Sequence, residues 1–165
     1  MRAGAGAGDG GGNVAEPTQV FTSPHVLEYP YSRSTGPVIG SFLTALRDGV
    51  LIGIRGTGGI VIVPPTEYDP YTSEETSGIV EVGPGGVVTS WAWVADPLPQ
   101  HPLQHPFAWA LVQLDGADTA MLHALDAGSP EAVSTGMRVT ASWKPADERV
   151  GNIFDLRAFV PEEAK

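Results

Sequence analysis

The chain has 165 residues, with nine Lys and Arg against 19 Asp and Glu, a net charge of −10 and no cysteine. This length accommodates one domain with an appendage and allows a real hydrophobic core. Without cysteine there is no thiolate nucleophile, cysteine-ligated zinc or iron–sulfur cluster. The acidic balance argues against nucleic acids and anionic membranes as partners, because both require basic patches.

Two further global features concern location and fold class. No apolar run is long enough to span a bilayer, and no signal-peptide pattern is present, so we expect a cytoplasmic protein. The 21 glycines and 15 prolines predict short strands and turns rather than long helices.

The N-terminal part predicts two segments without a core of their own. Residues 1–13 are a Gly-rich tail that we expect to be mobile. Residues 14–36 are polar and interrupted by prolines, which favours an extended arm. Tyr29 and Tyr31 are its aromatic residues. The arm is expected to lie either on its own domain or on another protein.

A helix is predicted over residues 37–48. Pro37 suits a first helical position, Gly49 suits a stop, and the apolar residues, among them Phe42 and Leu46, recur at helical spacing. The apolar stripe covers one face only. It packs either on the rest of its own domain or against a partner chain, and the sequence leaves both open.

A hairpin is predicted after the helix, so that residues 37–77 form one unit. Two β-branched runs, 50–54 and 60–63, flank the glycine-rich stretch 55–59. A phosphate-binding loop is not expected, because this stretch leads into a strand and then two prolines rather than into a helix N-terminus. We interpret it as a tight turn.

From residue 78 to residue 161 the alternation of apolar and polar residues is that of β-strands. A small closed barrel of the OB type accounts best for several short strands with one brief helical turn before the fourth, and a sandwich is the alternative. The predicted strands are 78–82, 87–95, 107–114, 119–127, 137–143 and 153–159.

Catalytic and metal-binding patterns are weak. His101 and His105 have the spacing of zinc ligands on a helix, with Asp96 as a conceivable third ligand, but four prolines between 97 and 106 prevent a regular helix. We therefore expect a rigid exposed loop. His123 lies in an alternating strand and has no readable partner. A metal-dependent hydrolase using the two loop histidines remains a distant alternative.

Three tryptophans raise the possibility of a nucleic-acid surface, since OB barrels stack bases on strand aromatics. Trp91 and Trp93 share one face of a strand, and Trp109 lies in the next one. Residues 77–165, however, carry eleven acidic and five basic side chains, which would repel a phosphate backbone. The tryptophans are therefore interpreted as core or interface aromatics.

The order helix, Gly-rich hairpin, Pro-Pro, turn and OB-like strands resembles a family of zinc-ribbon plus OB-fold proteins that associate with thiolases and thiolase-like lipid-transfer enzymes. The resemblance runs from about residue 37 to residue 161. Its motifs are Gly59-Ile60-Val61-Ile62-Val63-Pro64-Pro65 after the first ligand pair, Asp69-Pro70-Tyr71-Thr72 at the family's C-P-x-C, the barrel strands around 83–91 and 106–116, and 136–139. Arg55, Gly58, Asp69 and Thr72 stand at the four cysteine positions.

The resemblance implies a mainly β fold, namely an OB barrel preceded by a helix and a degenerate, rubredoxin-like ribbon that binds no metal. It also implies a non-catalytic accessory subunit of an acyl-CoA thiolase or thiolase-like aldolase complex in lipid or steroid side-chain metabolism. Such a subunit is expected to stabilise its partner, often as two plus two, and to help border the CoA entrance. The chain itself would bind no cofactor.

Partner docking is expected at Tyr29, Tyr31, Phe42 and Leu46, on the evidence of amphipathicity and expected exposure. The rival hypothesis is a free-standing barrel that binds an acyl-CoA or another lipid-like ligand by itself.

Overall fold

The computed structural model describes residues 20, 22–32 and 34–162. The chain divides into a first unit up to Arg33 and a compact unit from Ser34 onward. The predicted tail, 1–13, lies outside the described residues. The described part of the first unit contains no helix or strand. Among the described residues, no helix has the length and hydropathy needed to cross a bilayer.

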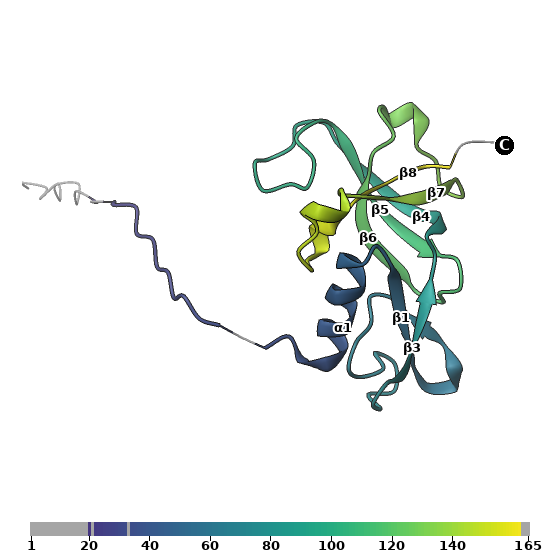
Figure 1. Cartoon of the computed structure of the whole chain (residues 1–165). Helices are drawn as coiled ribbons and strands as arrows, with labels where there is room; N and C mark the ends of the chain where they lie inside the picture. Colours follow the sequence, from purple (N-terminus) through teal and green to yellow (C-terminus); the bar gives the residue numbers. More distant parts are fainter. Residues whose placement is uncertain (1–19, 21, 33, 163–165) are drawn as a thin grey trace, which may run out of the picture. The chain divides into compact units, whose positions relative to one another are not determined.

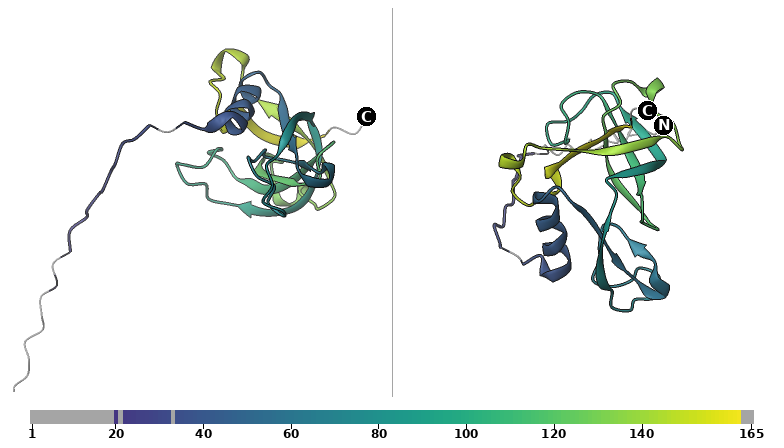
Figure 2. Two further views of the ribbon diagram at one scale, coloured as in Figure 1. Left: turned by 90° about the horizontal axis from the view of Figure 1, so that it is seen from below. Right: turned by 45° about the vertical axis from the view of Figure 1, so that its right-hand side comes forward.

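The compact unit confirms the predicted fold class of a mainly β protein with one helix and an OB-type barrel. Figures 1 and 2 show the helix α1 beside a small sheet, with the barrel at the other end of the unit. The elements, in chain order, are α1 (Gly36–Arg47), β1 (Leu51–Arg55), η1 (Thr57–Gly59), β2 (Val61–Ile62), β3 (Ser77–Val82), β4 (Gly85–Val94), β5 (Phe107–Leu114), β6 (Ala120–Leu125), η2 (Pro130–Ala132), β7 (Arg138–Trp143), η3 (Ala146–Glu148), η4 (Ile153–Asp155) and β8 (Leu156–Pro161).

The barrel has the strand order β4-β5-β6-β8-β7 and closes through pairing of β4 with β7. All its neighbouring strands are antiparallel except β6 and β8, which share the single parallel pair Leu125 and Phe159. Inward residues of β5, such as Ala110 and Val112, are fully buried, and the tryptophans of β4 pack against the same core. The interior is therefore filled by side chains.

Two strand predictions need correction. The stretch 78–82 was expected to open the barrel, but β3 pairs with β1 and completes a three-stranded sheet of order β2-β1-β3. The barrel begins at Gly85 instead. The last strand begins at Leu156 rather than at residue 153, because Ile153 to Asp155 form the 3-10 turn η4. In the first case the apolar pattern marks a strand but not the strand that pairs with it; in the second, the pattern does not distinguish a 3-10 turn from the start of a strand.

The three-stranded sheet is fastened to the barrel through the turn between β5 and β6. Asp118 accepts a hydrogen bond from the Val61 amide (2.7 Å) and donates its own amide to the Val61 carbonyl (2.9 Å). The Thr119 hydroxyl accepts from the Val63 amide (2.7 Å) and donates to its carbonyl (2.9 Å). These contacts satisfy backbone groups at the outer edge of the sheet, which would otherwise be free to pair with other chains.

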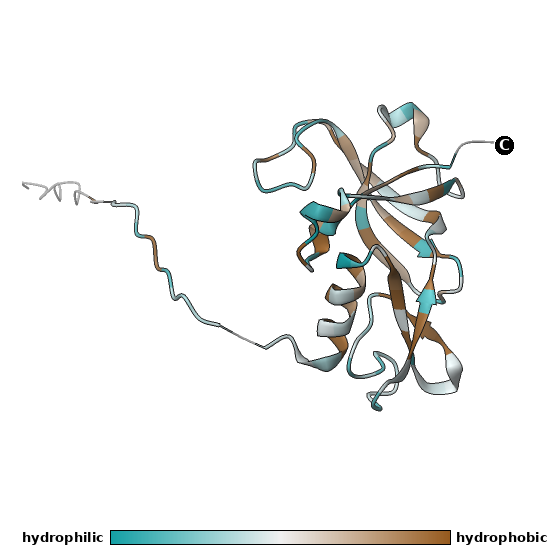
Figure 3. Ribbon diagram, viewed as in Figure 1, coloured by the Kyte–Doolittle hydropathy of each residue, from teal (hydrophilic) through white to brown (hydrophobic). Residues whose placement is uncertain are grey.

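Helix α1 joins the same core. Phe42 and Leu46 are 5% and 0% exposed and pack with residues of the sheet and of the barrel. Figure 3 shows hydrophobic residues concentrated in the strands of the sheet and barrel that this helix helps to cover. Of the two interpretations of its apolar stripe, packing within its own domain is correct. The expectation that Phe42 and Leu46 dock a partner was wrong, because neither side chain reaches the surface.

Candidate functional site

In the part of the arm that the structure describes, the two aromatic residues expected to contact a partner are exposed to solvent. Tyr29 and Tyr31 are 73% and 81% exposed, and the nearby Val26 and Leu27 are also exposed. In an extended chain, successive side chains point to opposite sides, so the side chains of residues 27, 29 and 31 lie on the same side. Large apolar side chains grouped in this way on an extended segment are a feature of segments that bind other proteins. The docking role of the two tyrosines stays a prediction.

The loops that the resemblance interprets as a degenerate ribbon are held together by a carboxylate, at a position where the resemblance implies a cysteine. Asp69 is 2% exposed. One of its oxygens accepts a hydrogen bond from the Thr57 amide (2.8 Å), and the other accepts from the amides of Tyr71 (2.8 Å) and Thr72 (3.2 Å). The hydrogen bond from Tyr71 is the main cause that lowers the Asp69 pKa, burial opposes it, and the bonds from Thr57 and Thr72 add to the lowering.

The donor set of the ribbon does not fit zinc. Both oxygens of Asp69 are occupied by backbone amides, and the Thr72 hydroxyl lies 2.8 Å from that of Thr57. Arg55 is a cation, and Gly58 has no side chain. Zinc in such ribbons requires thiolate, imidazole or free carboxylate ligands, so no metal step is assigned to this site. Instead, the hydrogen bonds of Asp69 link the two loops.

The proline-rich loop between β4 and β5 folds over the outside of the barrel. His101 packs edge-on against Phe107 and Trp109, with ring centroids 5.7 and 6.1 Å away. His105 instead points to Asp126, with Nε2 3.1 Å from a carboxylate oxygen. The two histidines thus have separate partners, and Asp96 joins neither of them in a metal-type cluster, none of which occurs among the described residues. Leu103 of this loop is buried and anchors the loop to the barrel, and its rigidity stays a prediction.

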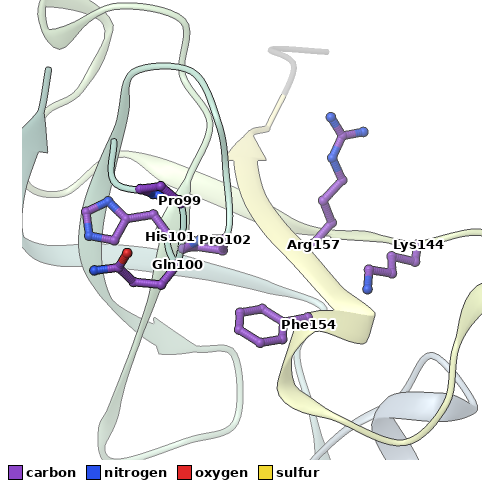
Figure 4. A pocket seen from close by; sticks show the side chains of 7 residues that line it. All are labelled: Pro99, Gln100, His101, Pro102, Lys144, Phe154 and Arg157. Carbon is purple, nitrogen blue, oxygen red and sulfur yellow. The ribbon is translucent and has the colours of Figure 1, made fainter. Parts of the chain in front are cut away.

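A second feature missed at the level of sequence is a cavity of about 320 Å³ beside this loop. One wall is the loop segment 99–102. The other carries Lys144, which follows β7, Phe154 from η4 and Arg157 from β8 (Figure 4). These segments are far apart in the chain, and no spacing pattern links them.

The turn that presents Phe154 is fixed by Asp155, which is fully buried. One oxygen of its carboxylate accepts hydrogen bonds from the amides of Gly151 (2.6 Å) and Asn152 (3.1 Å). The Asn152 side chain in return accepts from the Phe154 amide (2.8 Å). Burial alone would raise the Asp155 pKa, but these amide bonds, with the charge of Lys144, lower it. The turn is therefore a rigid support for the Phe154 ring.

His123 closes the weakly paired side of the barrel. It is 4% exposed, and its Nε2 lies 2.8 Å from the Leu156 carbonyl. A carbonyl only accepts, so Nε2 carries the hydrogen of this bond. Burial lowers the His123 pKa, and the hydrogen bond to Leu156 opposes that effect. The side chain bridges β6 and β8, which share only one backbone pair.

This arrangement predicts a pH dependence of stability. The folded-state pKa of His123 lies below the ordinary value of 6.5, so the unfolded chain binds more protons in the window below that value. The contribution of the buried, neutral His123 ring to the free energy of unfolding is fully present above about pH 6.5 and is lost as the pH falls through the folded-state pKa. We expect the Tm to fall between about pH 7 and about pH 5, and His123→Gln to flatten this slope.

His25→Gln serves as the matched control, because His25 lies on the exposed arm. An equal flattening by both substitutions would contradict the role of the buried ring.

Comparisons with known proteins bear on the barrel most directly. Residues 79–144 match the family model described as the ChsH2 C-terminal OB-fold domain. This segment, which runs from β3 to the residue after β7, is therefore similar to a ChsH2-type OB-fold domain. The resemblance proposed from sequence is confirmed over this segment. A comparison with curated proteins gives no match.

Solved structures extend the likeness beyond the barrel. A chain described as "Ltp2-ChsH2(DUF35) aldolase" aligns with a TM-score of 0.56 and 24% identity, over 73% of this chain and 91% of that one. A DUF35-family protein of unknown function from Sulfolobus solfataricus aligns with a TM-score of 0.52 and 20% identity, over 65% and 78%. At these identities the likeness establishes the shared fold.

Proposed function

We propose that this chain is the non-catalytic partner subunit of a thiolase-like enzyme that acts on acyl-CoA thioesters in lipid or steroid side-chain metabolism. The observation that carries the proposal is the match of residues 79–144 to the ChsH2 C-terminal OB-fold domain. A structurally similar chain is described as part of an Ltp2–ChsH2 aldolase. In this proposal the subunit stabilises its enzyme, helps border the CoA entrance and assembles as two plus two in the cytoplasm.

Two features of the structure support an accessory role. Among the described residues, the histidines of the barrel and its loop are engaged in packing, an ion pair or a buried hydrogen bond. The barrel interior is filled by side chains such as Val112, Leu125 and Phe159. A filled barrel speaks against the alternative of an acyl chain bound inside it, and the CoA thioester is assigned to the complex.

The test is purification of the tagged chain from its native lysate, with the mass of the eluted complex measured by size-exclusion chromatography and light scattering. We expect a thiolase-like enzyme at a fixed ratio. A monomer with no companion would contradict the proposal.

The arm provides a sharper version of this experiment. Tyr29→Ala combined with Tyr31→Ala should lower partner retention by about tenfold or more, because buried tyrosines are frequent hot spots of interfaces. Tyr68 and Tyr71 are the matched control pair, since both are exposed on the ribbon. Undiminished retention by the arm variant would remove the arm from the interface.

A further inference from the structure

Two leucines on the outside of the barrel stay exposed to solvent. Leu111 of β5 and Leu122 of β6 lie opposite each other in the strand register, and they are 38% and 58% exposed. On the other side of β5, the residues of β4 that face it are small. We define the outer strip as these two leucines with Ser90, Ala92 and Trp109, which line a shallow hollow of about 190 Å³.

The outer strip departs from the usual pattern of an antiparallel sheet, in which the solvent-facing side is polar. Strand β7 of the same barrel follows that pattern, because Arg138 and Thr140 alternate with the fully buried Val139. By contrast, none of the residues that line the hollow is charged, although the chain has a net charge of −10. Adjacent exposed apolar side chains without charge are typical of a surface that another molecule covers.

The chain's own proline-rich loop shows which groups fit this side of the sheet. Leu103 of the loop is buried in one cluster with Phe107, and Trp109 packs against that cluster. The His101 ring lies edge-on to Trp109, with the ring centroids 6.1 Å apart. Trp109 thus contacts the loop and also lines the open hollow. A leucine and the edge of a ring are therefore groups that this face already accommodates within the protein.

The charge of the chain narrows the choice of occupant. A second copy would bring another net charge of −10 to the contact, and like net charges oppose self-association. The proposed function supplies a partner of another kind, the enzyme subunit, and the present inference rests on that proposal. The outer strip lies within residues 79–144, the segment whose match carries the proposed function.

We propose that the outer strip is a docking surface for an apolar segment of the enzyme subunit. That segment places uncharged side chains of leucine or aromatic type against Trp109, Leu111 and Leu122, as the loop does on the adjoining part of the sheet. A contact of this kind depends on the burial of apolar area. Its strength therefore changes little with ionic strength, whereas salt screens contacts between exposed charges.

The experiment uses the full-length chain and its enzyme subunit, which is identified by mass spectrometry after co-purification and then separated. Leu111→Thr with Leu122→Thr replaces both leucines by residues that suit strands and pair well across them, so the barrel should stay folded. We expect the Kd for the enzyme to rise by about tenfold or more. The wild-type Kd should change by less than about threefold between about 0.1 and about 0.5 M NaCl.

Ile79→Thr with Val150→Thr is the matched control, because it removes two exposed apolar side chains outside the outer strip. It should leave the Kd unchanged. Leu122→Gln alone alters a side chain that is more than half exposed, so its weakening of the complex cannot be ascribed to unfolding. Circular dichroism checks the fold of each variant.

The outcomes separate this inference from the proposed function. An unchanged Kd in the strip variants, or an equal loss in the control, would overturn the docking surface and leave the enzyme partnership intact. A dimer of the isolated chain that the strip variant abolishes would assign the surface to a second copy and overturn the proposal. If the wild-type chain retained no thiolase-like enzyme, the proposed function would fail and this inference with it.

Discussion

Leu46→Ala should lower the free energy of unfolding by about 3–4 kcal/mol, the range found when a fully buried leucine is truncated in a rigid core. Leu46 is 0% exposed and lies where helix, sheet and barrel share one hydrophobic cluster. The cavity left behind would be bordered by three elements that cannot collapse independently. Urea denaturation followed by tryptophan fluorescence measures the change.

The control is on the same helix. Ile39 is 44% exposed. Ile39→Ala removes a similar apolar volume from a site that water already reaches, so we expect a loss within about 1 kcal/mol. Equal losses in the two variants would show that α1 is not part of the core. Because Phe42 and Leu46 are buried, a charge at either position would destabilise the domain itself, so docking has to be tested at exposed residues.

The strands could be predicted well because local pattern determines them. The run from Phe107 to Leu114 was predicted to the residue, since alternation marks its interior and prolines and Asp115-Gly116 mark its ends. Which strands pair with each other could not be predicted in the same way. The residues of β3 have an ordinary strand pattern, and nothing in it distinguishes pairing with β1 from pairing within the barrel.

The helix shows the same limit. Its amphipathic stripe predicted a buried face but could not tell which protein buries it. Phe42 and Leu46 turned out to pack on their own domain. Tyr29 and Tyr31, which have no helical or strand context, remain exposed as expected for an arm.

The cavity could not have been found from sequence. Lys144, Phe154 and Arg157 are joined to the loop at 99–102 only by the closure of the barrel. A single lysine or arginine in an acidic chain is ordinary at the level of sequence. Their place beside the exposed Phe154 ring at one cavity is set by the tertiary structure.

The loops at Asp69 show how a ribbon-like unit can be linked without metal ligands. In place of bonds from a metal to four side chains, one carboxylate accepts three backbone amides from two loops. Gly56 makes this possible, because a Cβ at that position would collide with the Asp69 carboxylate and with Ile62. The presence of Asp at a cysteine position was visible in the sequence, but its role required the contacts.

Asp69→Ala should therefore open the ribbon locally while the barrel stays folded. The amides of Thr57, Tyr71 and Thr72 lose their acceptor, and we expect their hydrogen exchange to become at least about tenfold faster. Asp69→Asn keeps one carbonyl oxygen and should give a smaller change. Exchange measured by NMR at these amides, with those of β5 as an internal reference, tests the prediction.

Glu75→Ala is the matched control, because Glu75 is an exposed acid in the same loop. If removal of Glu75 accelerated exchange as much as removal of Asp69, the loop would be sensitive to charge in general rather than to one buried acceptor. If neither did so, the two loops would be held by the sheet alone. Selective acceleration in Asp69→Ala would mean that a hydrogen-bonded carboxylate does the linking work for which related ribbons use cysteines, so the ribbon could keep its shape without binding metal.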